Sequence, residues 1–301
     1  MKWKDFHTDI NKNKNFLSFV NPTISLNNNA TIFTIGSCFA RNIEDILKEY
    51  FVFPVRSYRG RSEEYRAPRA RGILNKFTPR TILRELEWLE ACLKNEAVFD
   101  DITSDFFLFK KNDGACIDIG LRQFVSVSTD RFFERRKEIL NLYSQLSSSH
   151  AIILTLGNLE QWYWNNKPAE QAPTNLELKR SGSWSVKFDT FDHVLNDLEK
   201  IIGTLVAINP NLKIILTVSP VPMERTFQDK HIVLANMEGK INLWQSAQAM
   251  SQKNKNVYYF PSYEMINSLG PIAMESRDWR HVKNGFVTAV CGAFLKFSSK
   301  S

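Results

Sequence analysis

Short apolar runs alternate along this chain with longer stretches in which apolar residues recur every three or four positions. The short runs are typical of buried strands, and the longer stretches are typical of amphipathic helices. The runs fall at 31–35, 51–55, 151–156, 212–218 and 257–260, and the helical stretches at 40–50, 79–94, 129–147, 191–208, 231–251 and 284–297. Strand and helix alternate about five times, which predicts an α/β fold with a mostly parallel sheet and helices on both of its faces.

The segments between these elements indicate the domain organisation. Residues 1–29 are polar and predict an N-terminal arm, followed by one domain over 30–297. Inside that domain, Asn112-Asp-Gly114 separates two apolar runs at 106–109 and 116–119, which predicts an inserted β-hairpin region over about 98–128. Six arginines crowd into 56–71, where no helical or strand period survives. Long loops of this kind are often functional.

Composition narrows the functional classes. The chain has 301 residues, 43% of them hydrophobic, which is enough for a sizeable core, and a net charge of +7, which favours anionic partners. No stacking-aromatic motif accompanies the arginines, so nucleic acid is not expected as a partner. Four cysteines stand far apart without a CxxC pair, so no metal site is expected and a reducing compartment fits. Neither a signal peptide nor an apolar run of about 18 residues is found, which predicts a cytoplasmic protein without a membrane span.

Ser37 is the first candidate for chemistry. It follows a strand and Gly36 and precedes a helix, so it lies at the strand end where open α/β sheets bind ligands. Amide donors and the positive helix end stabilise an anion there, and a serine in that place is a nucleophile if a base reaches it. A plain turn in which Ser37 only caps the helix is the alternative. The neighbouring Cys38 is either a packed thiol or a nucleophile, because a helix start favours the thiolate.

His281 is the candidate base among the five histidines. Asp278 precedes it by three positions, and in a turn this spacing lets the carboxylate hold the nearer imidazole nitrogen and fix the tautomer. The far nitrogen can then accept the serine proton. His150, directly before a strand, and His193, in a helical stretch, are in positions more typical of structural histidines.

Six short blocks of the sequence resemble the GSCFA family, in the family's order, between about residues 30 and 297. They are Gly36-Ser-Cys-Phe-Ala40, Arg71-Gly-Ile-Leu-Asn75, Thr155-Leu-Gly-Asn-Leu-Glu-Gln-Trp162, Thr217-Val-Ser-Pro-Val-Pro222, Tyr259-Phe-Pro-Ser-Tyr-Glu264 and Asp278-Trp-Arg-His281. That family is itself similar to the SGNH or GDSL-like hydrolases. The resemblance implies a three-layer α/β/α sandwich, with Ser37 as nucleophile, His281 as base and Asp278 as orienting acid. It also implies ester hydrolysis or acyl transfer at a carbohydrate, such as the modification of a polysaccharide.

One block departs from the SGNH pattern at the expected oxyanion hole. SGNH enzymes carry an asparagine at the position of Leu159, so the donors here are expected from the Ser37 amide, Gly72, Asn75 and Asn158. Losing one such donor typically costs about 100- to 1000-fold in rate. The departure motivates an alternative function, a non-catalytic glycan- or nucleotide-binding domain that retains the fold.

Three further residues are expected to bind substrate. Glu160 is expected to bond a substrate hydroxyl or an active-site loop, Trp162 to stack on a sugar face, and Arg71 to bind an anion. For Glu160 and Trp162 the alternatives are a solvated carboxylate and a cover for the core edge. The arginines of 56–71 either solvate a flexible loop or bind the carboxylates of an acidic polysaccharide or the phosphates of an acyl-coenzyme A co-substrate. No bound cofactor is expected.

Overall fold

A parallel sheet of four strands lies at the centre of the molecule. The computed structural model describes residues 16–65, 70–123, 125–174 and 183–300. The strands lie in the order β1-β4-β8-β9, and each strand pairs in parallel with its neighbours. Their bounds are β1 Ile32–Gly36, β4 Ala151–Leu156, β8 Lys213–Val218 and β9 Val257–Tyr259. The predicted parallel sheet is therefore confirmed.

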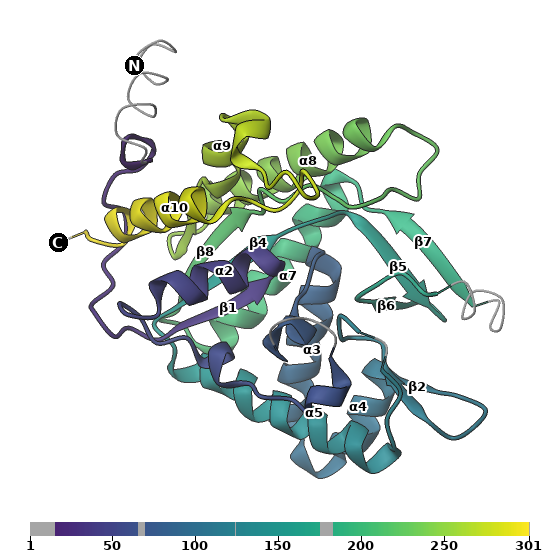
Figure 1. Cartoon of the computed structure of the whole chain (residues 1–301). Helices are drawn as coiled ribbons and strands as arrows, with labels where there is room; N and C mark the ends of the chain where they lie inside the picture. The colour runs from purple at the N-terminus through teal and green to yellow at the C-terminus, as the bar shows by residue number, and fades with distance from the viewer. Residues whose placement is uncertain (1–15, 66–69, 124, 175–182, 301) are drawn as a thin grey trace.

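Helices cover both faces of this sheet and form a three-layer sandwich (Figure 1). Successive strand side chains point to opposite faces, so Ile152 and Leu154 belong to one core and Ala151 and Ile153 to the other. The first core is closed by α3 Pro79–Lys94, α5 Thr129–Tyr143, α7 Phe191–Ile208 and α8 Ile232–Lys253. The second is closed by α2 Cys38–Leu47, α9 Ser262–Asn267 and α10 Asn284–Phe297. The sheet is buried on both sides because its strands are apolar along their whole length.

Helix ends follow the capping signals in the sequence. Thr78 caps α3 by accepting from the amide of Thr81, and Pro79 stands at the first helical position, where its missing N–H costs nothing. Thr190 and His193 form a reciprocal capping box at the start of α7. The predicted bounds 191–208 and 284–297 are confirmed.

Two expected strands differ from the structure. The run 51–55 is not a strand, because only Val52 bridges to Thr31 and the chain then turns into the 3-10 helix η2 at Pro54, which has no N–H for a sheet ladder. The predicted hairpin exists as β2 Leu108–Lys110 and β3 Cys116–Asp118, but the residues before it form the helix α4 Phe99–Phe107. The 3-10 helices are η1 Leu17–Phe19, η2 Pro54–Ser57, η3 Ser62–Glu64, η4 Ala70–Leu74, η5 Glu96–Val98, η6 Ser144–Ser148 and η7 Gly270–Ala273.

A second, antiparallel sheet was missed by the sequence analysis. It has the order β6-β5-β7 and consists of β5 Glu160–Trp164, β6 Lys167–Ala169 and β7 Trp184–Phe188. It extends from the end of β4, to the right of the main sheet in Figure 1. Asn165 and Asn166 join β5 to β6 with φ of 46° and 63°. Two positive φ values define the tight hairpin turn that asparagine tolerates, so this Asn-Asn pair directly after the aromatic run Trp162-Tyr-Trp164 was the available signal.

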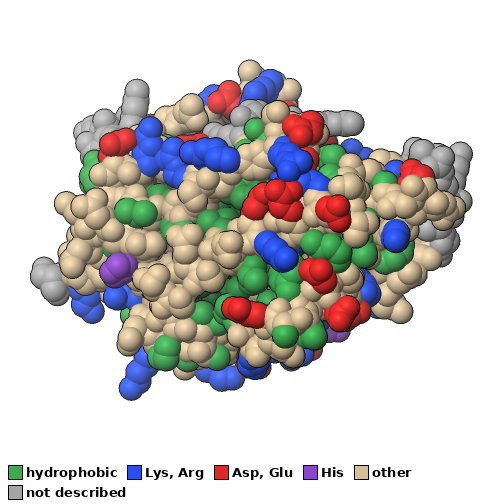
Figure 2. All heavy atoms as spheres, turned by 90° about the horizontal axis from the view of Figure 1, so that it is seen from below, with side chains coloured by type: hydrophobic (Ala, Val, Ile, Leu, Met, Phe, Trp, Pro, Cys, Tyr) green, Lys and Arg blue, Asp and Glu red, His purple; other side chains and the backbone are tan. Residues whose placement is uncertain are grey.

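Acidic and basic side chains are interspersed on the face seen from below (Figure 2). Some surface charges are paired, as between Arg61 and Glu134 at 2.8 Å and between Lys94 and Glu90 at 2.7 Å.

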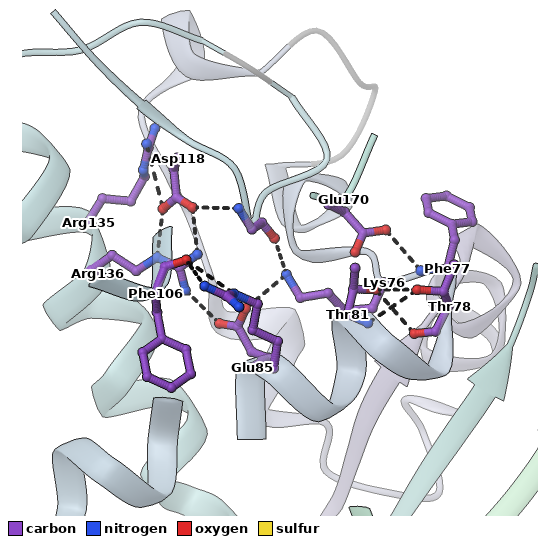
Figure 3. A network of polar contacts seen from close by, with 12 residues as sticks. Lys76, Phe77, Thr78, Thr81, Glu85, Phe106, Asp118, Arg135, Arg136 and Glu170 are labelled. Carbon is purple, nitrogen blue, oxygen red and sulfur yellow. Dashed lines mark hydrogen bonds and ion pairs between the residues drawn. The ribbon is translucent and has the colours of Figure 1, made fainter. Parts of the chain in front are cut away.

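A buried ionic network fixes the segment before α3 (Figure 3). Arg136 of α5 donates two hydrogen bonds of 2.6 Å to Asp118 of β3 and one of 2.7 Å to Glu85 of α3. Lys76 pairs with the same Glu85 at 3.1 Å and also donates to the carbonyl of Gly120. All four charged side chains are at most 1% exposed. The network therefore ties two helices and the hairpin to residues 70–78, which form part of the cavity described next.

Candidate active site

The turn between β1 and α2 places Ser37 and Cys38 at the carboxyl end of the sheet. At Gly36, a Cβ atom would lie 2.6 Å from the Cβ and the carbonyl oxygen of Thr155, so only glycine lets β1 approach β4 this closely. Ser37 is the N-cap of α2, and its Oγ accepts from the amide of Phe39 at 3.4 Å. The same hydroxyl donates to Ser219 Oγ at 3.1 Å, and Ser37 is only 2% exposed. Both hydrogen-bonding roles of Ser37 Oγ are thus occupied within the protein.

Asp278 and His281 form a preorganised pair in the loop before α10. Asp278 Oδ1 accepts from the amides of Arg280 and His281, both at 3.0 Å, and Oδ2 lies 2.5 Å from His281 Nδ1. The backbone bond from the His281 amide is the main reason why the pKa of Asp278 is held below its usual range. An ionised Asp278 fixes the tautomer and orientation of the ring. The expected Asp-x-x-His contact is present, and it leaves Nε2 for a partner across the cavity.

Cys38 contacts His281. A hydrogen bond between the two side chains is the largest of the causes that raise the pKa of His281 to about 9, ahead of the bond from Asp278, and burial opposes them. Cys38 is partly exposed, whereas Cys92, Cys116 and Cys291 are buried. Among the cysteines, all of which lie in the described residues, Cys38 is therefore the one available to a ligand.

Two cavities meet at this point. The first, of about 650 Å³, is lined by Ser37, Cys38, Asn158, Trp162, Ser219 and His281 among others. The second, of about 500 Å³, lies on the other side and is lined by Arg41, Asn42, Glu275, Arg277 and Asn284. Cys38, Gly72, Asn75 and His281 line both. The structure thus brings Ser37, Cys38 and His281 to one cavity wall, although some 240 positions separate the turn from the histidine.

The four expected oxyanion donors all line the first cavity. The Ser37 amide makes a long bond of 3.4 Å to the carbonyl of Thr155. Asn158 Oδ1 accepts from the amides of Leu159 and Glu160, so the donor end of this side chain, Nδ2, is not used by that turn. Leu159 is fully buried in the core. The donors that remain are therefore on Asn158, Asn75 and the backbone near Gly72.

Glu160 holds a loop at the rim of the cavity. Its carboxylate accepts from the Thr226 hydroxyl, from the Phe227 amide at 3.0 Å and from Gln228 Nε2 at 3.0 Å. Trp162, on the same strand, meets the ring of Phe227 edge-on at 4.9 Å between centroids. Both residues line the first cavity. Of the two roles expected for Glu160, contact with an active-site loop is the one that the structure contains.

This arrangement predicts a protease-sensitive loop when Glu160 is removed. In Glu160→Ala, three donors of segment 226–228 lose a charged acceptor, and each such bond contributes about 1.5–3 kcal/mol. We expect cleavage of the native protein by trypsin after Arg225, which is well exposed, to become at least about tenfold faster, because local opening controls proteolysis.

Glu238→Ala is the matched control, since Glu238 only pairs with Lys230 at the surface of the same region. Equal cleavage rates in the two variants would contradict the role given to Glu160.

Arg71 does not line either cavity. Its guanidinium pairs with Glu44 at 2.9 Å and with Asp45, and it is 11% exposed. Arg56 also reaches Asp45, at 3.7 Å, and Arg61 pairs with Glu134. The arginines at 66 and 69 lie outside the described residues. The arginines that do line the first cavity are Arg122, Arg225 and Arg280, none of which the sequence analysis singled out.

Two buried polar residues near the cavity were given no role from the sequence. Lys240 of α8 is 2% exposed and donates to the carbonyls of Gly157, Ser219 and Val221 at 2.8, 2.8 and 3.0 Å, which ties together the ends of β4 and β8. Burial lowers the pKa of Lys240 to about 7. Glu170 lines the first cavity, and burial raises its pKa to about 7. Lys240 belongs to Asn236-Met-Glu-Gly-Lys240, which partly resembles a GSCFA block, whereas Glu170 lies in a segment without a recognisable motif.

In the part of the chain that the structure describes, no group of three His, Cys, Asp or Glu side chains is placed to hold a metal ion. Within the same residues, no helix has the length and apolar character needed to cross a membrane.

Comparisons with known proteins place this geometry in context. Residues 31–294 match the GSCFA family. A search of curated proteins gave no match. Among solved structures, a family 3 carbohydrate esterase from Talaromyces cellulolyticus is similar with 10% sequence identity and a TM-score of 0.37, over 88% of this chain and 94% of that chain.

Proposed function

This chain belongs to the GSCFA family, and on that premise we propose that it is an esterase or O-acyltransferase that acts on an acylated carbohydrate. The observation that carries the proposal is the Asp278–His281 pair, which shares a cavity wall with the Ser37–Cys38 turn at the carboxyl end of a parallel sheet. A nucleophile, a base and an orienting carboxylate in one cavity are the requirements of acyl transfer.

The proposed reaction proceeds through a covalent acyl-enzyme. His281 Nε2 takes the proton of a nucleophile on the turn, which attacks the acyl carbonyl carbon, and the protonated ring then gives the proton to the departing sugar oxygen. The resemblance assigns the attack to Ser37, and Cys38 is the second candidate because it contacts His281. Donors from Asn158, Asn75 or the nearby backbone would stabilise the oxyanion. Water or a second sugar hydroxyl then removes the acyl group, so the same site serves hydrolysis and transfer.

The carbohydrate assignment is supported by the walls of the first cavity. Trp162 presents an aromatic side chain there, and hydrogen-bonding groups of Asn158, Gln171 and Glu170 stand near it. Sugars are bound by such combinations of an apolar ring and a few placed polar groups. Arg122, Arg225 and Arg280 are in the same lining together with the carboxyl groups of Glu160, Glu170 and Glu224, so a substrate would meet charged groups of both signs.

The direct test is release of acetate from acetylated oligosaccharides, neutral and uronate-containing, by the full chain. We expect turnover by the wild type, and none above background by a His281→Ala, Asp278→Asn double variant of normal fold.

Calorimetric binding of the same sugars, equally tight in wild type and double variant and without acetate release from either, would instead establish the non-catalytic glycan-binding function.

A further inference from the structure

We propose that the nucleophile is Cys38 and not Ser37, so that the acyl-enzyme is a thioester at Cys38 Sγ. This inference rests on the proposed acyl-transfer function and assigns its nucleophile. Sequence comparison points to the serine of Gly36-Ser37-Cys38, whereas the positions of the side chains point to the thiol.

The first observation is the contact of Cys38 with the base. Its side chain hydrogen-bonds the ring of His281, whose other nitrogen is held by Asp278 at 2.5 Å. Cys38, His281 and Asp278 thus form the sequence of nucleophile, base and orienting acid that covalent catalysis requires. Cys38 is also the first residue of α2, and it lines both cavities together with His281.

The second observation is that Ser37 is engaged elsewhere. Its hydroxyl donates its proton to Ser219 Oγ and accepts from the Phe39 amide, in a residue that is 2% exposed. To attack a substrate, this hydroxyl would have to give up its bond to Ser219 and redirect its proton to His281. The contacts assign Ser37 a positioning role, as the cap that starts α2 and so orients Cys38.

The third observation is a free ligand-binding group beside the thiol. Asn75 is 6% exposed, lines both cavities together with Cys38 and His281, and its Oδ1 has no hydrogen-bond partner in the protein. A buried amide oxygen without a partner is rare in native structures and marks a place where a ligand donor is expected. A substrate hydroxyl bound there would lie at the junction of the two cavities, next to Cys38.

The reaction balances without any added reagent. The Cys38 thiol proton moves to His281 Nε2, a C–S bond forms at the acyl carbon, and collapse of the adduct breaks the ester C–O bond while the imidazolium proton moves to the leaving alkoxide. Water or an acceptor hydroxyl then attacks the thioester and gives its proton to His281. The C–S bond breaks, and the thiolate recovers that proton.

Contacts from Cys38 and Asp278 together raise the pKa of His281 to about 9, against the effect of burial. Other charged groups that line the two cavities are of both signs, and they include Arg41, Arg122, Glu224, Arg225, Glu275 and Arg280.

Alkylation by iodoacetamide tests the pair without any substrate. We expect Cys38 of the native wild type to react at least about tenfold faster at pH 7 than Cys38 of His281→Ala, because the ring accepts the thiol proton as the C–S bond forms. The buried Cys92, Cys116 and Cys291 are internal controls, and peptide mass spectrometry identifies the site. A wild-type rate no higher than that of the variant would overturn the inference.

Trapping with p-nitrophenyl acetate identifies the acylated residue. We expect an acetyl group on Cys38 that neutral hydroxylamine removes, a loss of turnover of about 1000-fold or more in Cys38→Ala, and a loss within about tenfold in Ser37→Ala. Acetyl on Ser37, with activity retained in Cys38→Ala, would overturn this inference and keep the proposed function. Absence of an acyl-enzyme and of turnover in the wild type, with alkylation of Cys38 still faster than in His281→Ala, would overturn the proposed function while leaving the activation of Cys38 by His281 supported.

Discussion

Replacing His281 by alanine is expected to lower kcat/KM for p-nitrophenyl acetate by about 10³–10⁴-fold, the cost of removing one member of a nucleophile-base-acid unit. The same loss is expected for either nucleophile, because both require this ring to accept and return the proton. Asp278→Asn should approach the same loss, since a neutral amide does not stabilise the imidazolium as the carboxylate does at 2.5 Å from Nδ1, and its NH2 group can hold the ring in the wrong tautomer.

His193→Ala is the matched control, because His193 caps a helix at the surface and does not line either cavity. It should keep its turnover within about twofold once unfolded protein is subtracted. A His281→Ala variant with near-native kcat/KM would remove the basis of both the proposed function and the mechanism.

Replacing Arg136 by methionine is expected to lower the free energy of unfolding by about 3–5 kcal/mol, the usual cost of breaking a buried ion pair from one side. The change leaves Asp118 and Glu85 buried, with only Lys76 and the more distant Arg135 to compensate their charge. Urea unfolding followed by tryptophan fluorescence measures the effect. Because the network holds residues 70–78, we also expect the cavity wall at Gly72 and Asn75 to loosen.

Arg61→Met is the control for charge and size, since Arg61 pairs with Glu134 where both side chains are more than half exposed. Exposed pairs contribute at most about 1 kcal/mol. Adding Asp118→Asn to Arg136→Met should restore part of the stability, because the second change removes a stranded charge. If Arg136→Met lowered the free energy of unfolding by less than about 1 kcal/mol, the negative charges of Asp118 and Glu85 would be compensated without Arg136.

The fold was largely predictable because its central strands are buried on both faces. Such strands must be apolar throughout, and their helices must carry one apolar face, so both leave strong periodic signals. The hairpin β5–β6 left a weaker signal in the sequence. Pro168 stands within β6, and proline is uncommon in strands except at sheet edges, which is where β6 lies in the order β6-β5-β7. At 51–55 the error was the reverse, since Phe51, Phe53 and Val55 are buried there without forming a ladder.

The candidate site was predictable in part. The spacing of Asp278 and His281 is local, so the contact of the carboxylate with the ring follows from three positions of sequence and a turn. The roles of Arg71 and Glu160 depend on partners far along the chain, Glu44 in one case and residues 226–228 in the other. Nothing in the local sequence distinguishes an arginine that meets a substrate from one that meets a buried glutamate.

Alone, the sequence determined the strand-helix alternation, the turn that carries Ser37 and Cys38, and the Asp278–His281 unit, because each depends on neighbours in the chain. Tertiary structure decided which of the two adjacent side chains meets the imidazole and which turns toward Ser219. Successive residues at a helix start point in different directions, and the direction that faces the base is set by how α2 packs against a loop that arrives some 240 residues later.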